Sequence, residues 1–245
     1  MKFFAQRMGS SGLSNSEVSA LMDLVQPSRM VRAGGLIRRR NSHSPFTHFI
    51  SSGWAGRCDD LELGSRQITN FLVPGDFCDL HEDALGPIDH DIVALTSASV
   101  GSLPAEALLG LEAAHPAIAR AMWGFSLNES AILRAWITNL GRRESDARIA
   151  HLLCELFERL SRSGLAGDHS FQMPLTQQDL SDALGITAVH INRMLQRLRA
   201  MKLIHLENRV LTLLDVEGLR SLAGFEPAYL KMRAGCPAPP LRTSA

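Results

Sequence analysis

The stretch from Leu175 to Lys202 has the pattern of two short helices joined by a tight turn. Thr176 and Thr187 are suited to cap the two helices, because a threonine hydroxyl can accept hydrogen bonds from the free N–H groups of a first turn. Gly185, between the helices, supplies the backbone freedom that a sharp turn needs. Each helix has one apolar side, so each is expected to pack one face and expose the other. These apolar residues are Leu180, Ala183 and Leu184, then Ile191, Met194, Leu195 and Leu198.

This layout is that of a helix-turn-helix, in which the second helix enters the DNA major groove. Arg193 can bond two acceptors of a guanine, and Asn192 or Gln196 can do the same for an adenine. Taken alone, the stretch fits an ordinary helical hairpin in a globular core equally well. The DNA-binding interpretation predicts contacts from Thr176, Gln177, Gln178, Thr187, Ala188, Val189, His190, Asn192, Arg193 and Gln196.

The overall charge gives no independent sign of nucleic-acid binding. The 245 residues contain 25 Lys plus Arg and 25 Asp plus Glu, so the formal net charge is zero. A DNA-binding protein of this composition must concentrate positive charge locally, because phosphate contacts dominate affinity. Arg193, Arg197, Arg199 and Lys202 form such a local patch with no acidic residue among them.

The four cysteines, Cys58, Cys78, Cys154 and Cys236, lack the paired spacing of a zinc or iron–sulfur site. Reduced thiols in a cytosolic protein are therefore expected. The N-terminal residues do not have the pattern of a signal peptide, and no window is apolar for long enough to span a bilayer. We expect a cytoplasmic protein without a membrane partner.

The first half of the chain changes from a helical to a β-like pattern. Residues 1–26 are amphipathic, and Ser14 and Glu17 have the spacing of a capping box. Short β-like runs separated by Gly and Pro then predict a small antiparallel barrel or jelly roll. The runs are 30–32, 36–39, 47–51, 55–58, 67–73, 92–95 and 99–104.

A long helix is predicted from Pro116 to about Asn139, since proline suits a first helical turn. Gly141 follows as a predicted C-cap and hinge. An apolar stripe at near-heptad spacing favours a parallel partner helix from a second subunit, and the alternative is that the stripe packs on its own barrel. The stripe consists of Ile118, Met122, Phe125, Ile132 and Trp136.

The C-terminal part is predicted to be a winged helix-turn-helix. A helix over 144–161 and a polar loop precede the opening stretch, and two β runs at 203–206 and 210–213 form a hairpin after it. Asp215 caps a last helix. The predicted class is α+β, with a sensor barrel at 1–115, a dimerisation helix at 116–141, a DNA-binding domain at 142–225 and a disordered tail at 226–245.

The assembled order resembles the Crp/Fnr superfamily of bacterial transcription regulators over residues 10–224. Its most specific parts are "TQQDLSDALGITAVHINRMLQRLRAMKLI" and "LVPGDFCDL". The resemblance implies a cyclic-nucleotide-binding-like barrel and a homodimer that binds an inverted-repeat site on double-stranded DNA, with RNA polymerase as a partner. It implies a regulator and not an enzyme.

Two departures from the family pattern limit what is carried over. Well-studied members have a glutamate near the start of the recognition helix, where this chain has Val189. A carboxylate accepts from a cytosine amino group, whereas valine can only touch a thymine methyl. Cyclic AMP-binding members have an Arg-Ser pair where this chain has Asp89, His90 and Asp91. Cyclic AMP is therefore not expected, because carboxylates repel its phosphate.

An iron–sulfur cluster is not expected either, because the oxygen-sensing members of the family that this chain resembles hold theirs on N-terminal cysteines, and here no cysteine precedes Cys58. The cofactor or effector is unknown. Cys78 and His81 are candidate haem or metal ligands. Two alternatives remain open: a regulator that acts through a protein partner, and a jelly-roll metalloenzyme using His81, Glu82 and His90. The candidate effector pocket consists of Gly75, Asp76, Cys78, His81, Asp89 and His90.

Overall fold

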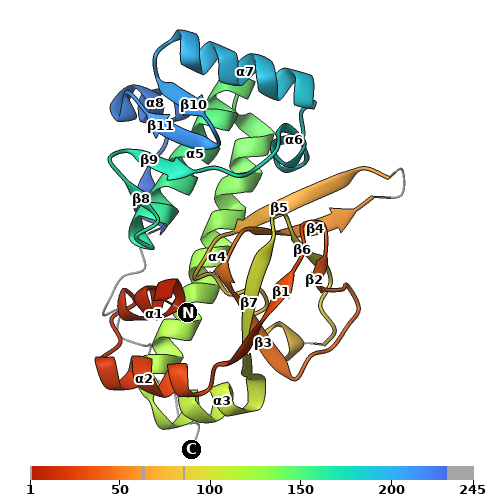
Figure 1. Cartoon of the computed structure of the whole chain (residues 1–245), viewed down its shortest axis with the longest axis vertical. Coiled ribbons are helices and arrows are strands. Elements are labelled where there is room, and N and C mark those ends of the chain that lie inside the picture. Colours follow the sequence, from red (N-terminus) through yellow and green to blue (C-terminus); the bar gives the residue numbers. More distant parts are fainter. Residues whose placement is uncertain (1, 62–63, 85, 231–245) are drawn as a thin grey trace, which may run out of the picture.

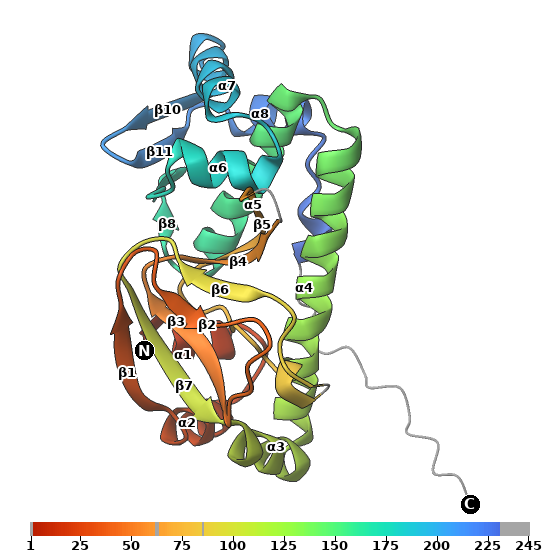
Figure 2. The same ribbon diagram turned by 90° about the vertical axis from the view of Figure 1, so that its right-hand side faces the viewer.

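The computed structural model describes residues 2–61, 64–84 and 86–230 (Figure 1). A small barrel and two N-terminal helices lie at one end, and a winged helix-turn-helix lies at the other. One long helix runs along both parts, as the turned view shows (Figure 2). The fold is α+β, as the sequence predicted.

The N-terminal segment forms two helices, α1 (Lys2–Gly9) and α2 (Asn15–Asp23). The predicted capping box is present at the start of α2. The Ser14 backbone N–H donates to the Glu17 carboxylate at 2.8 Å, and the Glu17 N–H donates to the Ser14 hydroxyl at 3.3 Å. Both caps satisfy N–H groups that have no partner within the helix.

The barrel consists of two antiparallel sheets. One sheet has the order β1-β7-β3 and the other β2-β6-β4-β5. The predicted β runs all become strands, with ends that differ by a few residues. The strands are β1 (Gln26–Val31), β2 (Leu36–Arg38), β3 (Phe46–Ser52), β4 (Ala55–Asp60), β5 (Arg66–Leu72), β6 (Asp91–Ala94) and β7 (Ala98–Pro104); a short 3₁₀ helix, η1 (Glu82–Ala84), lies before β6.

After the barrel come α3 (Ala105–Ala114) and the long helix α4 (Pro116–Arg142). At about 1.5 Å per residue, the 27 residues of α4 span about 40 Å. The predicted cap at Gly141 is wrong, because Gly141 lies inside the last turn. Arg143, with extended backbone, ends the helix instead.

The predicted stripe on α4 faces the chain's own core. Ile118, Met122 and Phe125 pack among the N-terminal helices and the barrel, whereas Ile132 and Trp136 join the core shared with the C-terminal helices. These five side chains are therefore covered within the chain and not available to a second subunit. The opposite side of α4 carries a separate exposed apolar row, formed by Trp123, Leu127 and Ile137.

The C-terminal part contains α5 (Ser145–Arg162), α6 (Gln177–Leu184), α7 (Ala188–Ala200) and α8 (Val216–Ala223). A four-stranded sheet packs beside them in the order β10-β11-β9-β8. Its strands are β8 (Ala166–Gly167), β9 (Ser170–Gln172), β10 (Ile204–Glu207) and β11 (Val210–Leu213).

Two tight hairpins shape this sheet. The β10–β11 hairpin is the predicted wing, and Asn208 and Arg209 in its turn have φ of 50° and 62°. The β8–β9 hairpin falls in the segment predicted as a loop. Asp168 and His169 form its two-residue turn with φ of 48° and 57°. Positive φ at both central residues is typical of the type I′ turn, which suits the strand twist of a hairpin.

The chain remains ordered beyond the predicted DNA-binding domain. Pro227–Leu230 form a 3₁₀ helix, η2, that packs against α4 and α5. Phe225 and Leu230 are buried in the core. The predicted disordered tail is therefore wrong for residues 226–230, because these apolar side chains anchor them; residues 231–245 lie outside the described part. None of the described helices is both long and apolar enough to cross a membrane.

Candidate DNA-binding site

The first helix of the motif, α6, begins with a reciprocal cap. The Asp179 N–H donates to the Thr176 hydroxyl at 3.1 Å, and the Thr176 N–H donates to the Asp179 carboxylate at 2.9 Å. Threonine and aspartate at this spacing satisfy two backbone donors at once. The cap therefore fixes where α6 begins.

The turn between α6 and α7 is held by three local features. Gly185 has left-handed backbone, with φ 63° and ψ 32°, which glycine adopts without a steric cost. The Ser181 hydroxyl donates to the Ile186 carbonyl at 2.6 Å. The Thr187 hydroxyl then accepts from the His190 N–H at 3.2 Å and starts α7. These contacts set the angle between the two helices.

The inner side of α7 packs into the C-terminal core through Ile191, Met194, Leu195 and Leu198. Its outer side is exposed at the end of the molecule farthest from the barrel (Figure 1, Figure 2). Val189 is the most exposed large apolar residue of the described chain, at 72%. None of the residues that the structure describes covers this outer side, so within them it is free to meet another molecule.

The predicted DNA contacts lie together along α6 and α7. Eight of the ten residues are exposed: Thr176, Gln177, Gln178, Thr187, Val189, Asn192, Arg193 and Gln196. Ala188 and His190 are half-buried, and the Nε2 atom of His190 is covered without a hydrogen-bond partner among the described residues. His190 consequently offers less to a ligand than its neighbours do.

The cationic patch of α7 is smaller than the sequence suggested. Arg197 pairs with Asp146 at 2.8 Å, and Arg199 donates to the Leu206 carbonyl at 3.0 Å, joining α7 to the wing. Within the described ranges, Arg193 makes neither an ion pair nor a hydrogen bond. Arg193 is therefore the arginine of α7 that is most available to a ligand, and the side chain of the exposed Lys202 just after α7 has no partner among the described residues either.

Comparison with known proteins gives the family. A sequence model of the Crp-like helix-turn-helix domain matches residues 147–222. An anaerobic regulatory protein of Pasteurella multocida is 24% identical over 222 residues, which are 90% of this chain and 80% of that protein. The fumarate and nitrate reduction regulatory protein of Vibrio cholerae is 25% identical over 214 residues, covering 86% and 84%. The chain belongs to the Crp/Fnr superfamily. It is a DNA-binding transcription regulator and not an enzyme.

Solved structures agree with the fold of this Crp/Fnr regulator. FixK2 from Bradyrhizobium japonicum has a TM-score of 0.71 at 23% identity, covering 80% of this chain and 96% of that chain. A CooA variant from Carboxydothermus hydrogenoformans has a TM-score of 0.65 at 16% identity, covering 83% and 89%. Both matches extend over the barrel as well as the helix-turn-helix.

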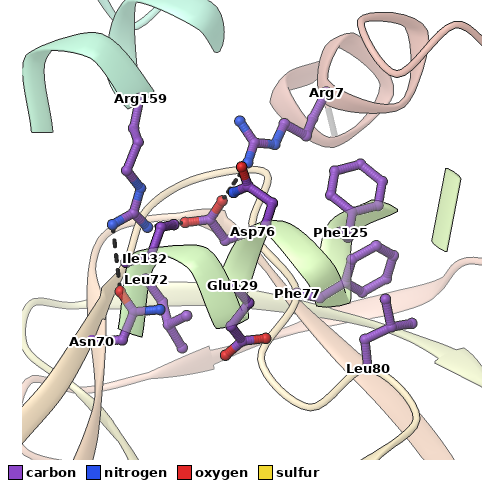
Figure 3. Close-up of a pocket in the computed structure, with 11 residues that line it drawn as sticks. Arg7, Asn70, Leu72, Asp76, Phe77, Leu80, Phe125, Glu129, Ile132 and Arg159 are labelled. Atoms are coloured by element: carbon purple, nitrogen blue, oxygen red, sulfur yellow. Dashed lines mark hydrogen bonds and ion pairs between the residues drawn. The ribbon is translucent and has the colours of Figure 1, made fainter. Parts of the chain in front are cut away.

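The barrel half of the Crp/Fnr regulator contains a cavity of about 40 Å³ (Figure 3). It lies where the barrel meets α1, α4 and α5. Its apolar lining consists of Leu72, Phe77, Leu80, Phe125 and Ile132, and polar side chains line the rest. The polar lining consists of Arg7, Asn70, Asp76, Asn128, Glu129 and Arg159.

Asp76 alone of the six predicted effector-pocket residues lines this cavity. Its neighbour Gly75 has φ of 96° and lies so close to α1 that an added Cβ would stand 3.1 Å from the Phe3 carbonyl. Cys78 is fully buried, and its backbone carbonyl accepts from Arg57 at 2.8 Å. These two residues support the turn and do not open into the cavity.

The other three predicted pocket residues, His81, Asp89 and His90, make contacts away from the cavity. His81 pairs with Glu112 of α3 at 2.8 Å. His90 lies 2.8 Å from the exposed Asp89 and 3.8 Å from Glu82. The part of the chain that the structure describes holds no cluster of three or more His, Cys, Asp or Glu side chains suited to a metal ion. The candidate ligands Cys78 and His81 therefore belong to no such cluster among the described residues.

The described cysteines are unreactive in this arrangement. Burial raises the pKa of Cys58 and of Cys154 to about 12, and it raises the pKa of Cys78 well above its ordinary value. A thiol must ionise to act as a nucleophile or metal ligand. These three side chains behave as small apolar residues of the core.

Two cavity residues, Arg7 and Arg159, were missed at the level of sequence. Arg159 lies on the same side of α5 as Leu152 and Leu156, although arginine is rarely fully buried. The position of Arg159 on the apolar face of a predicted helix was thus the sequence signal that could have identified it as a buried functional residue. Nothing comparable marks Arg7, whose short helix contributes Phe4 and Met8 to a different core, beside the barrel.

Proposed function

We propose that this regulator binds an inverted-repeat DNA site as a homodimer, under the control of a signal at the barrel that is not cyclic AMP. The exposed outer side of α7 carries the proposal, because it joins a free Arg193 to amide side chains at helical spacing. Two such helices in a dimer would enter successive major grooves about 34 Å apart.

The individual contacts follow from side-chain chemistry. Arg193 would read a guanine, and Asn192 or Gln196 an adenine, while Val189 would touch a thymine methyl. Thr176, Gln177, Gln178 and Thr187 would bind phosphates beside the helix starts, where free N–H groups also favour an anion. Ala188 and His190 would add close packing, since both are half-buried.

The exposed row on α4 supports the homodimer. Trp123, Leu127 and Ile137 fall on one side of the helix, with the exposed Ser130 and Arg134 between them. The intervals of four, three, four and three residues along this row are those of a coiled-coil seam. A parallel copy of α4 would cover the row and bring the two α7 helices to the same end of the dimer.

The barrel interior supports a signal other than cyclic AMP. Sites for small organic ligands usually have about 300 Å³ or more, whereas the cavity here has about 40 Å³. No arginine lies between Gln67 and Arg120, and the two cavity arginines, Arg7 and Arg159, already share the Asp76 carboxylate. Among the described residues that line the cavity, a cyclic phosphate would therefore meet no unpaired arginine.

The proposal divides the chain into a sensor at 1–115, a dimer helix at 116–141 and a DNA-binding domain at 142–230. We also propose that the regulator acts in the cytoplasm and contacts RNA polymerase at promoters. The relatives named as anaerobic regulators suggest redox or respiratory control as a class of signal. The buried cysteines argue against thiol chemistry as its source.

Selection of bound fragments from sheared genomic DNA tests the proposal. Sequencing of the bound fraction is expected to return one motif with two inverted half-sites about 10 base pairs apart. Affinity for that motif should fall steeply as salt rises, because phosphate contacts release counterions. A bound fraction without any common motif would contradict the proposal.

A further inference from the structure

An arginine of the DNA-binding domain reaches into the sensor barrel. Arg159 of α5 donates to the Asp76 carboxylate at 2.7 Å and to the Phe71 carbonyl at 2.7 Å. Its side chain is 3% exposed, and Figure 3 shows it reaching from α5 toward the barrel turn. A buried guanidinium requires such partners, because an unpaired charge away from water is very unfavourable.

Asp76 lies at the meeting point of three parts of the chain. Besides Arg159, it pairs with Arg7 of α1 at 3.4 Å. Burial acts to raise the pKa of Asp76, but the charges of Arg159 and Arg7 outweigh burial and hold that pKa below its usual value. Asp76 is thus a carboxylate whose charge both arginines need.

The network continues from Arg159 into the C-terminal core. Arg159 also contacts Glu155 at 3.3 Å, and Glu155 accepts from the Trp136 indole at 3.1 Å and from the Tyr229 hydroxyl at 2.8 Å. One group of hydrogen bonds therefore connects the barrel turn, α4, α5 and the η2 segment.

A second arginine also connects the two domains, but it belongs to the barrel and reaches into the DNA-binding domain. Arg66 of β5 contacts the carboxylates of Asp182 at 2.7 Å and Asp179 at 3.1 Å, both on α6. The neighbouring Gln67 amide donates to the Ala183 carbonyl at 3.2 Å. Asp179 is also the partner of Thr176 in the capping box of α6, so the barrel holds the first helix of the DNA-binding motif at its start.

We infer that the Arg159–Asp76 and Arg66–Asp179/Asp182 contacts form an arginine latch that holds the helix-turn-helix on the barrel, and that the turn carrying Asp76 is where a barrel signal releases it. This route passes directly from barrel to DNA-binding domain and does not run along α4. Because a buried charge is either paired or hydrated, the latch has two discrete states.

The cavity places the latch within reach of a signal. Arg7, Asp76 and Arg159 all line it, so any change that fills or closes the cavity alters the distances within the latch. The closed latch leaves the outer side of α7 uncovered and fixed in direction, which lowers the ordering that DNA binding requires. Opening the latch therefore weakens DNA binding. The expected change in DNA affinity rests on the proposed function, whereas the contacts of the latch do not.

The test compares full-length variants by amide hydrogen exchange and by DNA affinity. Asp76→Asn and Arg159→Met each break the first contact, and their double variant completes a mutant cycle. Arg66→Gln breaks the second contact on a half-exposed side chain, where the fold tolerates change. The matched control is Arg40→Gln, because the Arg40 side chain bonds to Asp59 and to the Asp89 carbonyl of the barrel, and to no described residue of the DNA-binding domain.

The latch predicts roughly tenfold faster exchange in α6 for Asp76→Asn, Arg159→Met and Arg66→Gln, and DNA affinity roughly fivefold weaker. The double variant should resemble the worse single variant, since both remove one contact. Arg40→Gln should match the parent protein. Unchanged α6 exchange in Arg66→Gln would overturn the inference, even if the buried variants fail to fold. Hydrogen exchange tests the latch even if no DNA site is found. A failure of the latch can therefore be told apart from a failure of the proposed function.

Discussion

Ile132 and Ile137 are five residues apart on α4 and lie in opposite environments. Ile132 is 3% exposed and packs in the shared core, whereas Ile137 is 70% exposed. A single helix thus carries two apolar rows. One row holds the barrel and the DNA-binding domain together, and the other requires a partner to be covered.

A double substitution, Leu127→Asp with Ile137→Asp, is expected to convert a dimer into folded monomers. Two carboxylates in an apolar seam repel each other and lose hydration, while neither position supports the internal core. Sedimentation velocity measures the change in mass. Leu109→Asp, at an exposed position of α3, should leave the dimer intact. A dimer that survives the double substitution would place the subunit interface elsewhere.

Val189→Glu is expected to change base preference at one position of each half-site. A carboxylate at this exposed place on α7 can accept from a cytosine amino group, whereas valine favours a thymine methyl. The discrimination should change by about 1–3 kcal/mol. Affinities for operators with each base pair substituted in turn measure it. An unaltered preference at all positions would show that residue 189 does not face a base.

The buried His151 predicts a loss of stability in mild acid. Burial, with a smaller effect from Arg143, lowers the pKa of His151 to about 4, while an imidazole in the unfolded chain has a pKa of about 6.5. Between these values the unfolded chain binds more protons, so the free energy of unfolding falls as pH decreases. The full decrease is about 3 kcal/mol.

His151→Phe is the matched variant for this measurement, because phenylalanine keeps an aromatic ring against Phe225 and Tyr229 without titrating. Urea unfolding at pH 7 and pH 5 should show a smaller loss in the variant than in the parent protein. Equal losses in the two proteins would assign the acid sensitivity to other groups.

Much of the fold follows from local sequence. Thr176, Thr187 and Gly185 act within a few residues of their partners, so capping and turn chemistry predicted the helix-turn-helix correctly. The two-residue turn at Asp168 and His169 also depends on local backbone geometry, with positive φ at both residues. It was not predicted, because the strands on either side are too short to show an alternation of apolar and polar residues. Periodicity alone could not decide which apolar row of α4 faces inward, since both rows have helical spacing.

The cavity beside the barrel was less predictable, because its contacts join distant residues. Asp76 and Arg159 are 83 positions apart, and no local pattern pairs them. His81 and His90 are close to Cys78 in sequence, but the turn and η1 direct them to different partners. Proximity along the chain therefore suggested a pocket that the fold does not assemble.

DNA binding by the Arg193→Ala variant tests the central claim most directly. Fluorescence anisotropy on the selected operator and on unrelated DNA, with Arg40→Ala as control, measures affinity and specificity together. A bidentate arginine–guanine pair contributes about 1–3 kcal/mol, so operator affinity should fall about 5- to 150-fold while affinity for unrelated DNA changes little. A folded Arg193→Ala protein that binds its operator as tightly and as specifically as the parent would contradict the account.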